Sequence, residues 1–301
     1  MFNYSAFGLE LSSEFQLFQL KQHEIKTEPD VRIISVTLSE KEVPSDGVHI
    51  ENCMITFCVE NLARFRITCG NLIEVSPFGY PDFSQISVYI MGSCMGAVLH
   101  QRGELPMHGS CVTDGSRAIL FTGDSGAGKS TLASVFLTHG WKLMTDDVSL
   151  IRDPEGTPMV QPSYPSQKLW ESSPEMKRHA EEDIHSLYER DGELKFGVSA
   201  EKTFCSVMKP LAMIVRLIVS DQPTAIRKMD EFTAIDQIMG NTYRPYMIMR
   251  DKLERHFQCC VTMACRIPVF ATVRNIGSDS REELYRLITD EYNKIEKSKE
   301  E

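Results

Sequence analysis

One glycine-rich stretch constrains this chain more than any other feature of its 301 residues. Residues 123–131 read GDSGAGKST and match the pattern G-x-x-x-x-G-K-[ST] at every fixed position. A short apolar, β-prone run precedes the stretch at residues 118–122, and residues 130–139 carry apolar side chains at helical spacing. A strand, a glycine loop and a helix in this order form a phosphate cradle. Glycines let backbone N–H groups turn toward an anion, and the helix adds the positive end of its dipole.

The residues of this loop predict a nucleotide site with a divalent cation. Lys129 would reach the β- and γ-phosphates, and the Ser130 hydroxyl would ligate the metal. The alternative is a chance glycine-rich turn with a lysine, and the flanking strand and helix speak against it. The predicted cofactors are therefore ATP and Mg²⁺. The predicted nucleotide-binding residues are Gly123, Asp124, Ser125, Gly126, Ala127, Gly128, Lys129, Ser130 and Thr131.

Composition and charge narrow the class of protein. Hydrophobic residues make up 42% of the chain and charged residues 25%, which is ordinary for a globular protein with a core of its own. The net charge of −10 argues against a broad nucleic-acid or membrane surface, so we expect neither as a partner. Polar residues such as Glu10 and Glu14 interrupt the N-terminal stretch, which excludes a signal peptide, and no run of 18 apolar residues exists. We expect a cytoplasmic protein.

The nine cysteines are odd in number and form no C-x-x-C pair. Cys259 and Cys260 are adjacent in an apolar, helical stretch. We therefore expect free thiols in a reducing compartment and no metal site built from cysteine and histidine.

Residues 1–91 predict a small β-rich domain without an obvious set of catalytic or ligand-binding residues. Its role would be to brace the rest of the chain or to dock a partner. Polar or Gly/Pro segments separate the candidate strands. These strands are Val31–Leu38, His49–Val59, Arg64–Cys69 and Ile86–Ile90.

A hairpin signal links a histidine to the glycine loop. Asp114-Gly115 stands between two β-prone runs, and such a dipeptide favours a two-residue turn. With that turn, Thr113 pairs with Ser116 and His108 lies opposite Phe121, beside the mouth of the loop. A single histidine in a strand is often structural, and the predicted register makes a functional role for His108 about as plausible.

Two adjacent carboxylates follow the helix of the glycine loop. Asp146 and Asp147 lie within an expected strand from Trp141 to Ile151, where burial is costly unless cations are near. Strand alternation would send them to opposite faces, so that one serves the metal and the other faces something else. A solvated turn at the end of a strand is the alternative.

The remaining segments predict an α/β unit over residues 92–301. Residues 92–102 form a short leading helix, and residues 191–206 are polar and contain Gly192, which suggests a mobile lid. Further helices are predicted to begin at Ser173, Asp230, Met247 and Ser280, and further strands to cover Leu211–Val219 and Pro268–Val273.

Taken together, Met107-His108-Gly109, residues 123–130 and Thr145-Asp146-Asp147 resemble the catalytic domain of HPr kinase/phosphorylase. Further segments resemble the smaller HPr-kinase-like proteins found beside lasso-peptide precursors. The implied fold is a P-loop (Walker A) kinase domain of HPr-kinase type, a mixed sheet with flanking helices, over residues 92–301 after the β-rich domain 1–91. The further similar segments are His100–Gly103, Tyr164-Pro165 with Lys168-Leu169-Trp170, Thr242–Pro245 and Arg266–Val269.

The resemblance implies a role for each site residue. Lys129 would neutralise the migrating phosphoryl group, and Ser130 would hold Mg²⁺. Asp146 would be the general base that takes the proton of an acceptor hydroxyl. Asp147 would lie near His108 and position the metal or the base. The implied catalytic residues are thus Asp146, Asp147, His108 and Lys129, and the implied metal ligands are Ser130 and Asp147.

The implied function is transfer of the γ-phosphoryl group of ATP to a serine hydroxyl, favoured as the C-terminal serine of a lasso-peptide precursor. A basic region of Lys168, Lys195, Lys202 and Arg244 could hold the carboxylate of such a peptide.

The chain lacks the second glycine-rich acidic segment of HPr kinases. The alternatives are an HPr-type protein serine kinase, a small-metabolite kinase and a non-catalytic nucleotide-binding regulator. HPr kinases are hexamers, which favours self-association to a homo-oligomer.

Overall fold

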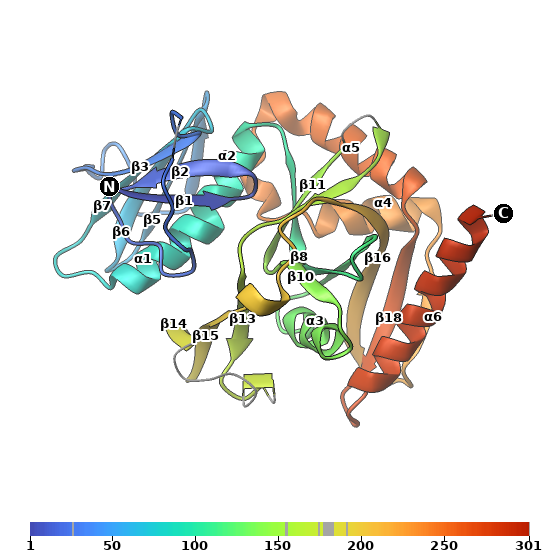
Figure 1. Cartoon of the computed structure of the whole chain (residues 1–301). Helices are drawn as coiled ribbons and strands as arrows, with labels where there is room; N and C mark the ends of the chain where they lie inside the picture. The colour runs from blue at the N-terminus through green and yellow to red at the C-terminus, as the bar shows by residue number, and fades with distance from the viewer. Residues whose placement is uncertain (26, 154–155, 174, 177–183, 191, 301) are drawn as a thin grey trace.

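The first part of the chain folds into a seven-stranded mixed sheet, drawn in blue in Figure 1. The computed structural model describes residues 1–300 apart from 26, 154–155, 174, 177–183 and 191. The strand order is β1-β2-β3-β7-β6-β5-β4, with parallel pairing of β3 to both β2 and β7. The strands are β1 Phe2–Ala6, β2 Leu9–Ser13, β3 Val31–Ser35, β4 Val48–Glu51, β5 Met54–Val59, β6 Ala63–Thr68 and β7 Leu72–Pro77.

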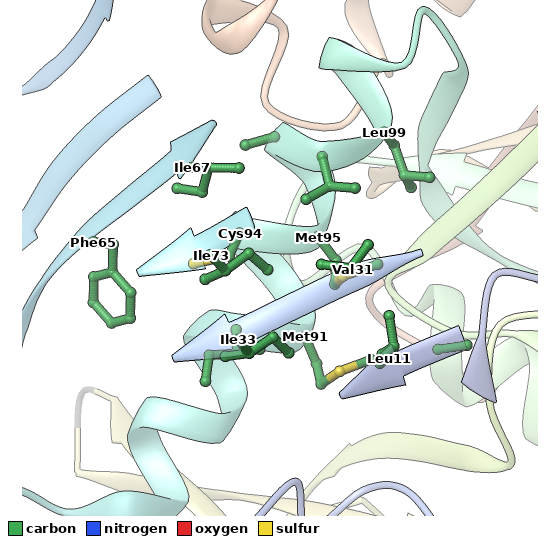
Figure 2. Packing of buried hydrophobic residues seen from close by; sticks show 14 of the residues in the cluster. Leu11, Val31, Ile33, Phe65, Ile67, Ile73, Met91, Cys94, Met95 and Leu99 are labelled. Atoms are coloured by element: carbon green, nitrogen blue, oxygen red, sulfur yellow. The ribbon is translucent and has the colours of Figure 1, made fainter. Parts of the chain in front are cut away.

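A helical segment covers this sheet and leads into the second region. It consists of α1 Phe83–Tyr89, the π-helical turn η1 Ile90–Cys94 and α2 Met95–Gln101. The predicted strand Ile86–Ile90 is wrong. The Asp82 carboxylate caps α1 by accepting the N–H of Ser84 at 2.8 Å. The apolar residues then continue at helical spacing, and Met91 and Met95 pack on the strands (Figure 2).

One pair of cysteines corrects the expectation of free thiols. Cys53 and Cys69 form a disulfide with their Cα atoms 5.0 Å apart. Antiparallel pairing of β5 and β6 joins Met54 to Thr68 and so brings the two cysteines opposite each other at the end of this hairpin. Counting cysteines could not show this, because the pairing depends on the strand register. The other cysteines are free.

The second region is built on an eight-stranded mixed sheet. Its centre is parallel, since β16 pairs in parallel with both β9 and β18, so the carboxyl ends of these strands meet at one edge. The α/β architecture with mixed sheets and flanking helices agrees with the sequence-based expectation. The strands are β8 Leu105–Thr113, β9 Ala118–Gly123, β10 Lys142–Thr145, β11 Val148–Arg152, β12 Met159–Gln161, β16 Lys209–Ser220, β17 Ala225–Lys228 and β18 Val269–Asn275.

Helices cover both faces of this sheet (Figure 1). Helices α3 Lys129–Thr138 and α6 Arg281–Glu300 bury apolar side chains with Phe121 and Ile119 of β9. Helices α4 Glu231–Gly240 and α5 Leu253–Arg266 pack with the alternate residue Leu120. Two 3₁₀ turns, Pro245–Met247 and Arg250–Lys252, precede α5, which therefore begins later than predicted. No helix in the described part of the chain is long and apolar enough to cross a membrane.

A small third sheet has the strand order β13-β15-β14, and Gln167 of β13 is hydrogen-bonded to Ser130 and Ser134 of the glycine-loop helix α3. It contains β13 Ser166–Trp170, β14 Ile184–Arg190 and β15 Glu193–Ser199. The predicted lid over residues 191–206 contains β15, which pairs with a strand on each side. The predicted helix from Ser173 covers residues 174 and 177–183, outside the described residues, and its later part is the strand β14.

Candidate active site

The glycine loop connects β9 to α3 as its sequence predicts. Gly123 ends β9, and α3 begins at Lys129 after Gly128, whose φ of +100° is left-handed. A Cβ on Gly123 would lie 2.6 Å from the carbonyl oxygen of Leu217 on the neighbouring strand, so only glycine fits there. The loop therefore turns tightly at the carboxyl edge of the parallel strands, where anions bind in sheets of this kind.

Lys129 folds over this loop. Its Nζ donates hydrogen bonds to the carbonyl oxygens of Gly123 and Asp124 at 2.9 and 3.0 Å, and the residue is only 8% exposed. Burial lowers the pKa of Lys129, and the charge of Asp147 opposes that shift. The ammonium group is thus positioned inside the loop, where a phosphate would sit.

Asp146 accepts hydrogen bonds from three donors, one of them Ser130 at the start of α3. Its Oδ1 accepts the hydroxyls of Ser110 at 2.5 Å and Ser130 at 2.8 Å, and its Oδ2 accepts the backbone N–H of Lys168 at 2.7 Å. The residue is 2% exposed, and burial raises the pKa of its carboxyl group. A carboxylate beside the loop hydroxyl gives a set of hard oxygen donors, which fits Mg²⁺ together with substrate phosphates.

Asp147 is held instead by a lysine and a histidine. Lys168 Nζ lies 2.6 Å from its Oδ2, and His108 Nδ1 lies 3.4 Å from its Oδ1. Burial would raise the pKa of Asp147, but the charges of Lys168 and His108 hold it well below its usual range. Burial lowers the pKa of His108, although Asp147 opposes this. Asp147 is therefore ionised at neutral pH.

The two aspartates do not lie inside one strand, which corrects the predicted strand Trp141–Ile151. They form a turn between β10 and β11, and Asp147 has a φ of +70°. This turn replaces strand alternation, so both carboxylates face the same site rather than opposite faces of the sheet. The alternative of a solvated turn is also wrong, because Asp146 is buried.

The structure also corrects the predicted register of His108. Thr113 pairs with Ala118, and Phe121 lies opposite Ser110 rather than His108. The turn is longer than two residues because the Asp114 carboxylate accepts the N–H groups of both Ser116 and Arg117. His108 lies nevertheless beside the loop, since it pairs with Val148 immediately after the two aspartates.

Two cavities meet at these residues. The glycine-loop cavity, about 610 Å³, is lined by residues 125–126 and 128–131 together with Asp146, Lys195 and Arg274. The Tyr243 cavity, about 740 Å³, is lined by residues 240–246 and by side chains of α1 and η1. His108, Ser125, Asp147 and Lys168 line both cavities and are called the shared wall below.

The predicted basic region is divided between the two cavities. Lys168 belongs to the shared wall, Lys195 lines the glycine-loop cavity and Arg244 lines the Tyr243 cavity. Lys202 lines neither cavity and is exposed on the 3₁₀ turn Glu201–Thr203. The four side chains therefore do not form one anion site.

Asn241 is a site residue that the sequence did not reveal. Its Oδ1 accepts the backbone N–H of Gly123 at 2.9 Å, and its carbonyl oxygen accepts the N–H of His108 at 2.7 Å. It thus ties the start of the glycine loop to the shared wall. Asn241 lies more than a hundred residues after the loop, and no local pattern marks it. In contrast, Lys168 belongs to one of the segments that carry the family resemblance.

Comparison with known proteins adds little to this geometry. No protein-family model and no curated protein matches the chain. Among solved structures, the Hpr(Ser) kinase/phosphatase from Coxiella burnetii matches with a TM-score of 0.37 and 11% sequence identity, over 65% of this chain and 94% of that chain. Similarity at this level assigns no activity, so the function is inferred below from the site itself.

Proposed function

We propose that the chain is an ATP-dependent serine kinase. The glycine-loop cavity binds ATP with Mg²⁺, and the Tyr243 cavity receives the acceptor that carries the serine hydroxyl. The observation that carries this proposal is the shared wall, because it gives a phosphate cradle and a second cavity one ionised carboxylate in common, Asp147. Phosphoryl transfer needs little else beyond positioning and charge neutralisation.

Each residue has a role in this reaction. Lys129 neutralises the charge that develops on the transferred phosphoryl group. Asp147 takes the proton of the serine hydroxyl as the Oγ–phosphorus bond forms and the bond to the β-phosphate oxygen breaks, so that ADP leaves. Ser130 and Asp146 would hold Mg²⁺, which supplies neutralisation of phosphate charge when bound. His108 and Lys168 keep the Asp147 carboxylate ionised and oriented.

This division of labour between the aspartates reverses the one implied by resemblance. The resemblance implies Asp146 as the base and Asp147 as the residue that positions the metal or the base, with Asp147 among the metal ligands. The contacts favour Asp146 as the metal ligand because it is bonded to the Ser130 hydroxyl. They favour Asp147 as the base because it alone of the two lines the Tyr243 cavity.

The proposed acceptor is a peptide or protein, with the C-terminal serine of a lasso-peptide precursor as the favoured substrate on resemblance. An HPr-type kinase, a metabolite kinase and a nucleotide-binding regulator are the competing functions. The Tyr243 cavity speaks against a regulator, since a protein that only binds nucleotide needs no second cavity beside the phosphates. The proposed kinase acts in the cytoplasm and self-associates to a homo-oligomer.

Label transfer from ATP tests this function. The full chain is incubated with γ-labelled ATP and Mg²⁺, with and without a serine-ended precursor peptide. We expect labelled phosphoserine on the peptide and none when Asp147→Asn replaces the wild type. Label on a metabolite alone would replace the acceptor class, and nucleotide binding without any label transfer would contradict the kinase.

A further inference from the structure

Arg244 is a cation that lines the Tyr243 cavity and has no ion pair among the described residues. No carboxylate of the described residues lies within ion-pair distance of its guanidinium group. Its Nη1 donates to the hydroxyl of Tyr246 at 2.5 Å, and its Cζ lies 5.5 Å from the ring centroid of Tyr243. Its Nε is buried and has no hydrogen-bond partner among the described residues.

A half-buried cation with an unsatisfied donor is costly unless a ligand supplies the missing acceptor. The planar guanidinium group presents parallel N–H donors that match an oxyanion better than any neutral group does. Tyrosine hydroxyls such as that of Tyr246 provide further polar contacts without compensating the charge. The surroundings of Arg244 thus fit an anion that enters from the cavity.

The backbone holds Arg244 in place for such a ligand. Its φ is +47°, an uncommon conformation for a residue with a side chain, and residues of this kind gather at functional sites. The preceding Tyr243 is fixed on both sides, because its N–H donates to the carbonyl oxygen of Pro106 at 2.8 Å and its own carbonyl oxygen accepts His100 Nε2 at 2.7 Å. The following 3₁₀ turn closes with a bond from Met247 N–H to the Arg244 carbonyl oxygen.

Tyr243 connects Arg244 with the shared wall. Burial and the charge of Asp147 raise the pKa of the Tyr243 hydroxyl to about 12, and the charge of Arg244 opposes this shift. The hydroxyl therefore lies within electrostatic range of both groups. Lys168, which also lines the cavity, is already paired with Asp147, and the charges of Asp124 and Glu189 repel an anion from their parts of the cavity. An acceptor with one anionic end would accordingly place that end at Arg244.

We propose that Arg244 binds a carboxylate of the acceptor and so determines which hydroxyls reach Asp147. The substrate class is a hydroxylated molecule with a carboxylate, such as the free C-terminus of a peptide that ends in serine. This inference rests on the proposed kinase function. A binding test can fail or succeed independently of phosphoryl transfer, so it distinguishes the inference from the kinase function.

The test compares two probes that differ only in charge, N-acetyl-L-serine and N-acetyl-L-serinamide. Each is titrated by NMR into the full chain, with Mg²⁺ and a non-hydrolysable ATP analogue present to fill the glycine-loop cavity. We expect the acid to bind at least about tenfold more tightly than the amide, as the loss of one charge-assisted hydrogen-bond pair implies. Equal binding of the two probes to the wild type would overturn the proposal, and this comparison needs no variant.

Variants locate the effect. Arg244→Met should reduce binding of the acid to the level of the amide, and Arg244→Lys should restore part of the difference. Arg227→Met is the matched control, because Arg227 is exposed on the edge strand β17. A preference for the acid that persists in Arg244→Met would assign the anion to another cation and overturn the proposal. Failure of the kinase function would show instead as absent label transfer with the acid preference intact.

Discussion

The two cavities that meet at the shared wall are built in different ways. The glycine-loop cavity takes residues 125–126 and 128–131 of its lining from one short stretch of the chain, whose backbone and the side chains of Lys129 and Ser130 would bind phosphate and metal. The Tyr243 cavity is assembled from α1, η1 and residues 240–246, which are about 150 residues apart in the sequence. Phosphate chemistry is local and therefore visible in a sequence, whereas acceptor recognition depends on which distant elements the fold brings together.

The largest effect should come from the glycine-loop side. Lys129→Ala removes the cation nearest the proposed phosphates, so transfer should fall by on the order of 10⁴-fold. The fold should remain, as judged by circular dichroism, and the exposed Lys142→Ala is the control. Activity at the wild-type level in Lys129→Ala would show that this cavity does not hold the transferred phosphate.

Variants of Asp146 and Asp147 should distinguish the roles of the two aspartates. Asp147→Asn should lower kcat by about 10³-fold, the usual contribution of a general base, with little change in nucleotide affinity. Asp146→Asn should also abolish transfer and in addition raise the Mg²⁺ concentration needed for nucleotide binding. Calorimetry with Mg²⁺ and an ATP analogue measures this difference, and the exposed Asp236→Asn is the control. If Asp147→Asn weakens metal-dependent binding and Asp146→Asn does not, the roles are those implied by resemblance.

Asn241 tests whether the two cavities depend on each other. Asn241→Leu leaves the N–H of Gly123 without its acceptor, which should cost about 1–3 kcal/mol in the free energy of unfolding. Nucleotide affinity should weaken as the loop relaxes, while Asn71→Leu at an exposed site should change neither quantity. Chemical denaturation and an ATP titration measure both. Unchanged stability and affinity would show that the glycine loop holds its shape without the Tyr243 side.

The smallest effect concerns pH. Burial lowers the pKa of Lys195 to about 8, and its ammonium group lies 4.3 Å over the ring of Trp170. The charge of Lys195 is present below pH 8 and lost above it. Nucleotide affinity should therefore fall by about fivefold as the pH rises through 8, because a partly exposed ion pair contributes about 1 kcal/mol. Lys195→Arg stays charged and should remove the fall. A wild-type affinity that is constant from pH 7 to 9 would exclude Lys195 from phosphate binding.

The sequence predicted what depends on short patterns and missed what depends on register. The strand, loop and helix around Gly123 and Lys129 follow from local spacing, and the structure has them. The position of His108 beside the loop was expected from a hairpin register that is wrong by two residues, because the Asp114 turn was not recognised. The β-rich first part was expected, but Ile86–Ile90 is helical, since its apolar residues fit either period over so short a run.

Long-range contacts account for the rest. Lys168 reaches Asp147 from the third sheet, whose strand β15 lies where the polar composition suggested a lid. Asn241 reaches Gly123 across the sequence from the end of α4. Such contacts follow from the packing of whole elements, and no property of the individual segments fixes them.

A crystal structure of the full chain with Mg²⁺ and a non-hydrolysable ATP analogue tests the central claim most directly. The kinase account predicts the triphosphate in the glycine-loop cavity, with the γ-phosphate between Lys129 and Asp147 and the metal at Ser130 and Asp146. Nucleotide bound in the Tyr243 cavity, or a γ-phosphate that points away from the shared wall, would contradict it.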